Sequence, residues 1–529
     1  MIAPESPVPA PAALAPPTYN AAADLLGHHA GRLDKVAFVD EYASITYGAL
    51  AARVERCAGA LLGLGLEIEQ RVVLCLLDTI DFPTAFLGAI RAGIVPIPVN
   101  TLFKADDYAY ILADSRAKAA IVSAELLAPF MDAAHQANWH GTIVLSDPAA
   151  HADDATLPRL SAIVDLAEPL SAAAPTRADD ACFWLYSSGS TGKPKGTVHV
   201  QTSLMGTAQL FAQGVLGMRE DDVVYSAAKL FFAYGLGNAL TFPLSVGATA
   251  VLFSGRPTPD AVSGVLRRGQ PTIFCGVPTL FGSLLVHPDL PLREELALRV
   301  CTSAGEPLPE EIGRSWTARF GVDIVDGIGS TEMLHIFISN RPGAVKYGTT
   351  GITVPGYRAR IVDENGQDVA PGELGELEIC GPTAAAYYWN NREKSRRTFA
   401  GEWTRTGDKY RQDEDGCYVY CGRVDDMLKV GGIWVSPAEV ESALIAHEQV
   451  LEAAVIGVAD EQDLVKPKAF VVLKPGAVGD AALIEALKLH VKDRLAPYKY
   501  PRWIAFVDEL PKTATGKIQR HVLRAREQA

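Results

Sequence analysis

The chain has 529 residues, 48% of them hydrophobic and 21% charged, with a formal net charge of −14. This balance is typical of a globular protein with several domains, and the acidic excess argues against non-specific binding to nucleic acid or to an anionic membrane. No segment approaches the roughly 18 uncharged apolar residues of a membrane-spanning helix. The 8 cysteines are scattered. They predict neither a disulfide framework nor a metal site, and we expect a cytoplasmic protein.

Residues 1–19 are rich in proline and alanine and lack the basic and apolar regions of a signal peptide. We predict a disordered tail there. From residue 20 to about residue 170, helical and strand patterns alternate, as in the helix expected at 47–64 and the buried strand expected at 71–77. Alternation of this kind predicts a mainly parallel α/β sheet.

Residues 186–196 (YSSGSTGKPKG) follow the apolar run at 182–185. Glycines let a backbone approach a phosphate, hydroxyls donate hydrogen bonds and lysines offset negative charge. The stretch therefore predicts a phosphate-binding loop, with a solvated Gly/Ser turn as the alternative. A Walker-type loop is excluded by the glycine spacing and because Lys193 precedes Pro194 rather than a hydroxyl residue.

The α/β pattern continues to about residue 302, with strands expected at 223–227, 248–253, 272–275 and 298–302. From residue 351, short alternating strands with turn signals predict an antiparallel β module. The composition changes again near Arg423, where a hinge and a hairpin are expected. The last hundred or so residues predict a small α+β domain.

Four further motifs follow the phosphate loop. In DGIGSTE (326–332), Thr331 and Glu332 suit a phosphate oxygen and a magnesium ion, although a capped helix start explains the pattern equally well. In TRTGD (404–408), Asp408 suits ribose hydroxyls or is an ordinary loop acid. The others are the group at 422–441 (GRVDD, KVGG and PAEVE) and PKTATGK at 511–517.

Taken together and in this order, the five motifs resemble the acyl-adenylate-forming (AMP-binding) superfamily over residues 20–525. Residues 229–240, 302–309 and 326–337 are most similar to the benzoate–CoA ligases. The resemblance implies an α/β fold with a large N-terminal domain of αβαβα-type layered sheets plus a β-barrel-like module (20–424). It also implies a small mobile C-terminal α+β domain (425–529).

The resemblance also implies the chemistry. A carboxylate attacks the α-phosphate of magnesium-bound ATP, pyrophosphate leaves, and the thiol of CoA then displaces AMP. The benzoate–CoA ligases convert benzoate in this way. The implied partners are a small aromatic acid, ATP and CoA. A homodimer and regulation by acetylation of Lys517, which removes a charge that the reaction needs, are also expected.

By the same resemblance, each motif has a role toward ATP. The β- and γ-phosphates would meet Ser187, Ser188, Ser190, Thr191 and Lys195. Thr331 would hold the α-phosphate, Glu332 the magnesium ion, and Asp408 with Arg423 the ribose. The adenine would lie against Ala304, Gly305 and Glu306, and Ile328 would replace an aromatic residue that stacks on adenine in many relatives. Asp326 and Gly327 would also belong to the ATP site. Lys517 would bridge the acid and the α-phosphate.

In the family the small domain rotates between the two half-reactions, and the matching pivot is Asp425. Lys429, Gly431 and Gly432 would then line the path of pantetheine, because glycines allow close approach to the backbone. The alternatives are that Asp425 is an ordinary salt-bridge acid and that the glycines form an ordinary hairpin turn.

The predicted acid pocket consists of Ala233, Tyr234, Gly235, Gly327, Ile328, Gly329, His335 and Ile336. Phe231 and Phe232 nearby are expected in the core, and His335 is either a structural histidine or a polar pocket wall. Small and aromatic residues without a fixed charge favour benzoate over a fatty acid or an amino acid. Alternatives are a 4-hydroxybenzoate or 2-aminobenzoate ligase, an enzyme that loads a carrier protein, and a non-catalytic relative.

Overall fold

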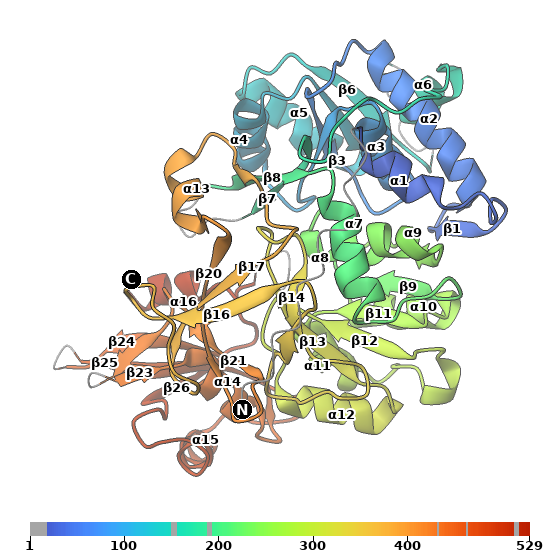
Figure 1. Cartoon of the computed structure of the whole chain (residues 1–529). Helices are drawn as coiled ribbons and strands as arrows, with labels where there is room; N and C mark the ends of the chain where they lie inside the picture. Colours follow the sequence, from blue (N-terminus) through green and yellow to red (C-terminus); the bar gives the residue numbers. More distant parts are fainter. Residues whose placement is uncertain are drawn as a thin grey trace, which may run out of the picture.

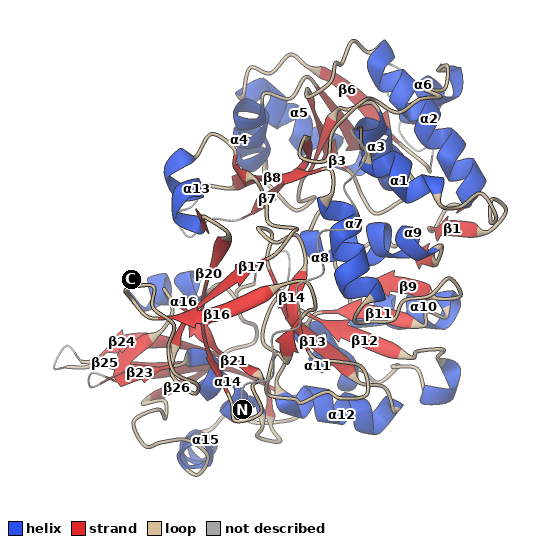
Figure 2. Cartoon of the chain, viewed as in Figure 1, coloured by secondary structure: helices blue, strands red, loops and turns tan. Residues whose placement is uncertain are grey.

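The computed structural model describes residues 18–149, 156–187, 193–430, 433–461, 464–512 and 518–528. Two helix-covered parallel sheets and two antiparallel sheets make up the large N-terminal part, and a smaller α+β part follows it (Figures 1 and 2). Within the described ranges, no helix is long and apolar enough to cross a bilayer.

The first parallel sheet has the strand order β4-β3-β5-β6 and lies at the top of Figure 1. Side chains alternate between its faces. Val73 and Cys75 of β3 pack with helices α4 and α5, and Val72 and Leu74 pack with α2 and α3. Its elements are β3 (Arg71–Cys75), β4 (Val95–Pro98), β5 (Ala119–Ser123), β6 (Thr142–Ser146), α2 (Tyr47–Gly63), α3 (Asp81–Arg91), α4 (Ala105–Ser115), η1 (Ala124–Leu126), α5 (Leu127–Gln136) and α6 (Leu160–Leu166).

The second sheet has nine strands in the order β15-β14-β13-β12-β11-β9-β10-β1-β2. Its central strands are parallel, and β2, β14 and β15 are antiparallel at its ends. The strands are β1 (Val36–Val39), β2 (Ser44–Thr46), β9 (Val223–Ser226), β10 (Thr249–Val251), β11 (Ile273–Gly276), β12 (Val300–Ser303), β13 (Ile324–Gly329), β14 (Ile336–Ser339) and β15 (Ile352–Thr353).

Helices cover both faces of this sheet. Phe274 and Ile324 pack with α10, α11 and α12, whereas Cys275 and Val325 on the opposite face share one core with α2, α3 and the segments α7 to α9. The two sheets thus share their inner helix layer, which confirms the predicted αβαβα order. The helices are α1 (Ala21–Gly27), α7 (Ser203–Thr207), η2 (Ala208–Gln213), α8 (Ala233–Leu236), η3 (Gly237–Thr241), α9 (Phe242–Val246), α10 (Pro259–Gly269), α11 (Pro278–Leu285), η4 (Arg293–Glu295) and α12 (Glu310–Phe320).

Two antiparallel sheets complete the large part. The three-stranded sheet consists of β7 (Ala181–Ser187), β8 (Lys195–Val200) and β18 (Tyr387–Tyr388). The five-stranded sheet is the predicted antiparallel module. It contains β16 (Arg358–Val362), β17 (Gly375–Cys380), β19 (Phe399–Ala400), β20 (Trp403–Gln412) and β21 (Tyr418–Arg423), and helix α13 (Arg392–Thr398) precedes β19.

The C-terminal part begins with the hairpin of β22 (Leu428–Val430) and β23 (Ile433–Val435). Strands β24 (Val450–Ala459), β25 (Val465–Leu473) and β26 (Trp503–Phe506) form one sheet, which packs with α14 (Pro437–Ile445), α15 (Ala481–Lys492) and α16 (Arg520–Gln528). This is the small α+β domain expected from the sequence. The boundary and pivot at Asp425 stay predictions.

Candidate active site

The phosphate loop begins and ends on two paired strands. Ser187 ends β7 and lies opposite Lys195, which begins β8. The buried hydroxyl of Ser187 has no hydrogen-bond partner among the described residues. Because an unsatisfied buried hydroxyl is costly, this position suits a polar ligand. Ser188, Ser190 and Thr191 lie outside the described residues.

Lys195, Glu332 and Tyr388 form the polar centre of the site. The Lys195 ammonium lies 3.6 Å from a Glu332 carboxylate oxygen and 4.3 Å from the centroid of the Tyr388 ring. The Tyr388 hydroxyl donates to the same carboxylate oxygen at 2.7 Å and accepts from Lys195 at 3.3 Å. Burial alone would raise the pKa of Glu332, but Lys195, Tyr388 and Arg423 outweigh it and hold that pKa below its usual value. The carboxylate is therefore ionised at neutral pH.

The DGIGSTE motif is a strand followed by a turn, so the interpretation as a capped helix start is wrong. Strand β13 carries Asp326, Gly327 and Gly329 and pairs with β14. A Cβ on Gly329 would lie 2.6 Å from the His335 carbonyl oxygen, so only glycine allows the close approach of the two strands. Burial raises the pKa of Asp326 to about 8, so this carboxyl group is largely protonated at neutral pH.

A buried histidine supports the turn that carries Thr331. His199 Nε2 lies 2.9 Å from the Thr331 carbonyl oxygen, and the imidazole stacks on Phe183 with ring centroids 5.1 Å apart. Burial lowers the pKa of His199 to about 4, so the neutral ring donates this hydrogen bond. Strand β8 therefore contributes Lys195 to the site and also holds the turn opposite it.

The predicted ribose-binding pair lies on two adjacent strands. Asp408 on β20 is the register partner of Arg423 on β21, and their side chains meet at 3.1 Å. Arg423 also donates to the Thr406 carbonyl oxygen at 3.1 Å. The charge of Arg423 also helps to lower the pKa of Glu332.

The predicted adenine-binding segment meets the C-terminal domain. Ala304 is buried after β12, and Gly305 has a φ of +98°, which favours glycine. The backbone N–H of Ile518 donates to a Glu306 carboxylate oxygen at 2.8 Å. The residue that follows Lys517 thus contacts the large domain at this segment. Lys517 itself lies outside the described residues.

The predicted acid-pocket residues come from three segments. The Tyr234 hydroxyl and Thr302 Oγ1 are 2.5 Å apart, and His335 Nε2 lies 3.3 Å from the Tyr234 carbonyl oxygen. Burial lowers the pKa of His335 to about 3, which leaves a neutral ring against Phe211 and Phe242. The predicted acid-pocket positions therefore carry no charged side chain.

Two glycines at the predicted pocket positions have no room for a side chain. A Cβ on Gly235 would lie 2.0 Å from the Lys229 carbonyl oxygen, and a Cβ on Gly327 would lie 2.8 Å from the Ile336 side chain. Ile336 belongs to the main core, and Ala233 and Ile328 pack against it. Phe231 is buried in that core, as expected, and Phe232 is partly buried against it.

The expected CoA-binding hairpin is exposed on one face only, because Leu428, Val430 and Val435 are buried. Asp425 and Lys429 are both exposed, and the Lys429 ammonium lies 5.6 Å from the centroid of the Trp434 ring. Gly431 and Gly432 lie outside the described residues. The role of the hairpin stays a prediction.

Two residues of the site were not found from the sequence. Tyr388 is separated from Lys195 by 193 positions and reaches it because β18 pairs with β8. His199 lies in an apolar strand, where a histidine is usually structural. The one available signal was its spacing from Lys195. Residues two apart in a strand share a face, so the side chains of Lys195 and His199, four positions apart on β8, point to the same face.

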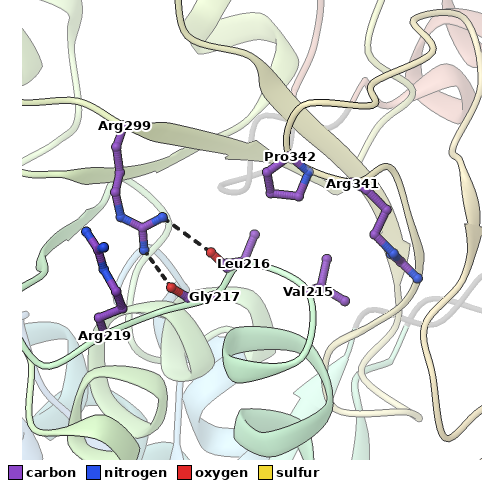
Figure 3. A pocket seen from close by; sticks show the side chains of 7 residues that line it. All are labelled: Val215, Leu216, Gly217, Arg219, Arg299, Arg341 and Pro342. Carbon is purple, nitrogen blue, oxygen red and sulfur yellow. Dashed lines mark hydrogen bonds between the residues drawn. The ribbon is translucent and has the colours of Figure 1, made fainter.

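A separate cavity of about 430 Å³ lies near the ends of η2 and β14 (Figure 3). Three arginines line it, but Arg299 is bound to Asp222 and to the carbonyl oxygens of Leu216 and Gly217. Arg341 is likewise bound to nearby carbonyl oxygens. None of the predicted site residues is among the described residues that line this cavity, so we do not assign it to a substrate.

Known proteins share both the fold and the sequence. The chain is 60% identical to a benzoate–CoA ligase of Thauera aromatica, over 97% of each chain. It is 51% identical to a 4-hydroxybenzoate–CoA/benzoate–CoA ligase of Rhodopseudomonas palustris, over 96% of this chain and 94% of that one. A solved benzoate CoA ligase from Burkholderia xenovorans LB400 superposes with a TM-score of 0.91 at 55% identity, covering 96% of this chain and 100% of the other.

The layered sheets, the small second domain and the cationic hairpin loop define a nucleotide-binding, adenylate-forming class of enzyme. The family model for "AMP-binding enzyme" matches residues 27–389, and that for "AMP-binding enzyme C-terminal domain" matches residues 439–517. The chain belongs to the AMP-binding enzyme family.

The first prediction concerns His199 and stability. The unfolded chain binds a proton on this residue below a pH of about 6.5, whereas the folded chain does so only near pH 4. Stability is therefore lost as pH falls between these values. Between pH 7.5 and pH 5, we expect the free energy of unfolding to fall by about 2 kcal/mol less in His199→Gln than in the wild type. The free energies are obtained from urea denaturation at each pH. The exposed His140→Gln should behave as wild type, and equal losses in all three proteins would contradict the prediction.

The second prediction concerns Tyr388. Tyr388→Phe removes one hydrogen bond to the Glu332 carboxylate. We expect kcat/KM for magnesium-bound ATP to fall about ten-fold, because a hydrogen bond to a charged group is worth roughly 1.5 kcal/mol or more. The neighbouring Tyr387 is 42% exposed, so Tyr387→Phe serves as the control. A Tyr388→Phe enzyme with unchanged steady-state parameters for ATP would show that the hydroxyl does not support the site.

Proposed function

We propose that this protein is an ATP-dependent aryl-CoA ligase that converts benzoate, ATP and CoA into benzoyl-CoA, AMP and pyrophosphate through an enzyme-bound benzoyl-adenylate. The observation that carries the proposal is the contact of Lys195 with Glu332 and Tyr388, on a chain 60% identical to a benzoate–CoA ligase. The ion pair of Asp408 with Arg423 supports it. The uncharged acid pocket supports an aromatic acid as the substrate.

In the first half-reaction, a benzoate oxygen attacks the α-phosphorus of ATP and pyrophosphate leaves with the electron pair of the broken bond. Both reactants are anions, so charge stabilisation and positioning contribute most. We assign Ser187, Ser188, Ser190, Thr191 and Lys195 to the leaving phosphates. Thr331 is assigned to the α-phosphate, and Asp408 with Arg423 to the ribose. Lys517 is assigned to the bond-forming oxygen atoms.

The residues present fit a magnesium ion. Glu332 provides an ionised carboxylate, the hard oxygen ligand that Mg²⁺ prefers, beside the phosphate loop. Among the described residues there is no group of three or more potential metal ligands, so phosphates and water would complete the coordination. When bound, the ion would offset negative charge on the phosphates. On the protein side, Lys195 and Tyr388 hold the carboxylate in position.

In the second half-reaction, the CoA thiol displaces AMP from the adenylate. We assign this step to a rotated small domain (425–529), with Asp425 as the pivot and Lys429, Gly431 and Gly432 beside pantetheine. Alternative substrates are 4-hydroxybenzoate, which the name of the Rhodopseudomonas palustris relative includes, and 2-aminobenzoate. Homodimer formation and acetylation of Lys517 are further proposals from the family resemblance.

The third prediction tests the reaction itself. Supplied with benzoate, ATP and CoA, the protein should form benzoyl-CoA and AMP in equal amounts. Without CoA, it should catalyse benzoate-dependent exchange between ATP and pyrophosphate. Exchange without thioester formation would favour an enzyme that loads a carrier protein. A preference for 4-hydroxybenzoate or 2-aminobenzoate in kcat/KM would overturn benzoate as the substrate, and no exchange with any aryl acid would overturn the function.

The fourth prediction concerns Lys517. Lys517→Ala should lower the rate of pyrophosphate release by about 10²–10³-fold, the scale of one preorganised electrostatic donor. Thioester formation from supplied benzoyl-AMP and CoA should remain close to that of wild type. Lys512 is paired with Glu452 at 2.7 Å, so Lys512→Ala is a matched loss of charge on the same segment. Pyrophosphate release at the wild-type rate in Lys517→Ala would overturn the assignment.

A further inference from the structure

A second cavity adjoins the phosphate loop on the side of Lys195 where helix α13 begins. Its volume is about 320 Å³, and Lys193, Lys195 and Lys394 all line it. Among its described lining residues, Asp114 is the single acid, and it accepts a hydrogen bond of 2.6 Å from the Tyr186 hydroxyl. We call this cavity the lysine pocket, defined by Lys193, Lys195 and Lys394.

Backbone hydrogen bonds between β18 and β8 place Lys394 beside the lysine pocket. Strand β18 pairs with β8, and the N–H of the next residue, Trp389, donates to the Gly196 carbonyl oxygen at 2.7 Å. The Asn391 side chain then accepts from the backbone N–H of Lys394 at 3.2 Å and begins α13. The short helix is therefore attached to the start of β8, the strand on which Lys195 lies.

The lysine pocket holds an excess of positive charge, because three lysines and one acid are among the described residues that line it. Lys193 lies 5.1 Å from the centroid of the Tyr110 ring, and neither Lys193 nor Lys394 forms an ion pair with another described residue. Burial lowers the pKa of Lys195, and the charges of Lys394 and Arg423 lower it further, against the attraction of Glu332. Like charges that face one cavity repel each other, so an anion that enters it relieves this repulsion.

Lys195 belongs both to the lysine pocket and to the catalytic centre. Its ammonium is bound to Glu332 and Tyr388, and the residue also lines the pocket. A phosphate group released beside Lys195 could therefore move away from Glu332 and toward Lys394 while it stays in contact with the Lys195 ammonium. Pyrophosphate is the anion that the reaction releases there, and a cavity of this volume accommodates it.

We propose that the lysine pocket is a departure site for pyrophosphate, which it binds after the bond to the α-phosphorus has broken. The proposal rests on the proposed function, because adenylation is the source of the anion. No covalent step takes place in the pocket. The pyrophosphate that left with the electron pair moves from the phosphate loop to Lys193, Lys195 and Lys394 and then to solvent.

The fifth prediction is the test, made with the full-length enzyme in ATP–pyrophosphate exchange with benzoate. Lys394→Ala should raise the KM for pyrophosphate by about five- to ten-fold, as expected for the loss of one charge-assisted contact. The KM for ATP should change less than two-fold, and Lys394→Arg should restore the wild-type value for pyrophosphate. On the same helix, Arg397 is paired with Glu393 and exposed, so Arg397→Ala is the matched control.

A binding measurement separates this proposal from the function. Isothermal titration of wild-type protein and Lys394→Ala with pyrophosphate, without ATP or acid, should show the same five- to ten-fold loss of affinity. Normal exchange with an unchanged KM and unchanged binding of pyrophosphate would overturn the departure site and leave the ligase function intact. Equal increases in the KM for ATP and in the KM for pyrophosphate would also overturn the departure site, because Lys394 would then belong to the ATP site. Absence of exchange in the wild type would instead overturn the proposed function.

Discussion

The site depends on the contact of Lys195 with Glu332 and Tyr388. Two paired strands of the three-stranded sheet and the turn after β13 of the nine-stranded sheet meet there. Lys195 and Tyr388 are separated by 193 positions in the chain. Moving a carboxylate and an ammonium group from water into the protein interior is costly unless the two groups pair with each other and form additional hydrogen bonds. Here the Tyr388 hydroxyl supplies such a bond, and the pKa of Glu332 stays low although the residue is buried. The fold thus maintains an ionised carboxylate beside a cationic loop.

The arrangement of the sheets explains how this contact is held. The antiparallel hairpin β7–β8 carries Lys195 and His199, while β13 and its turn belong to the nine-stranded sheet. His199 joins them through the Thr331 carbonyl oxygen, and β18 adds Tyr388 to the edge of the hairpin. The shared helix layer between the two parallel sheets forms one continuous core beneath these elements. Rigid strands rather than a single flexible loop therefore position the charges.

Much of the fold could be predicted from the sequence, because hydrophobic periodicity is a local property. The helix predicted at 47–64 is observed at Tyr47–Gly63, and the buried strand predicted at 71–77 is observed at Arg71–Cys75. The DGIGSTE motif was harder, since Ser-Thr-Glu begins a helix as readily as it forms a turn. Pairing of β13 with β14 decided between the two, and that pairing depends on residues beyond the motif.

The sequence by itself determined the class of chemistry, because five motifs in a fixed order along the chain resemble those of the adenylate-forming enzymes. It also determined the alternation of strands and helices and the separate character of the C-terminal region. Only the tertiary structure decided that Tyr388 supports Glu332, that His199 holds the Thr331 turn and that Lys394 faces Lys195 across a cavity. These relations arise from strand pairing and burial between segments far apart in the chain. No local pattern encodes them, since the free energy of each contact depends on its distant partner.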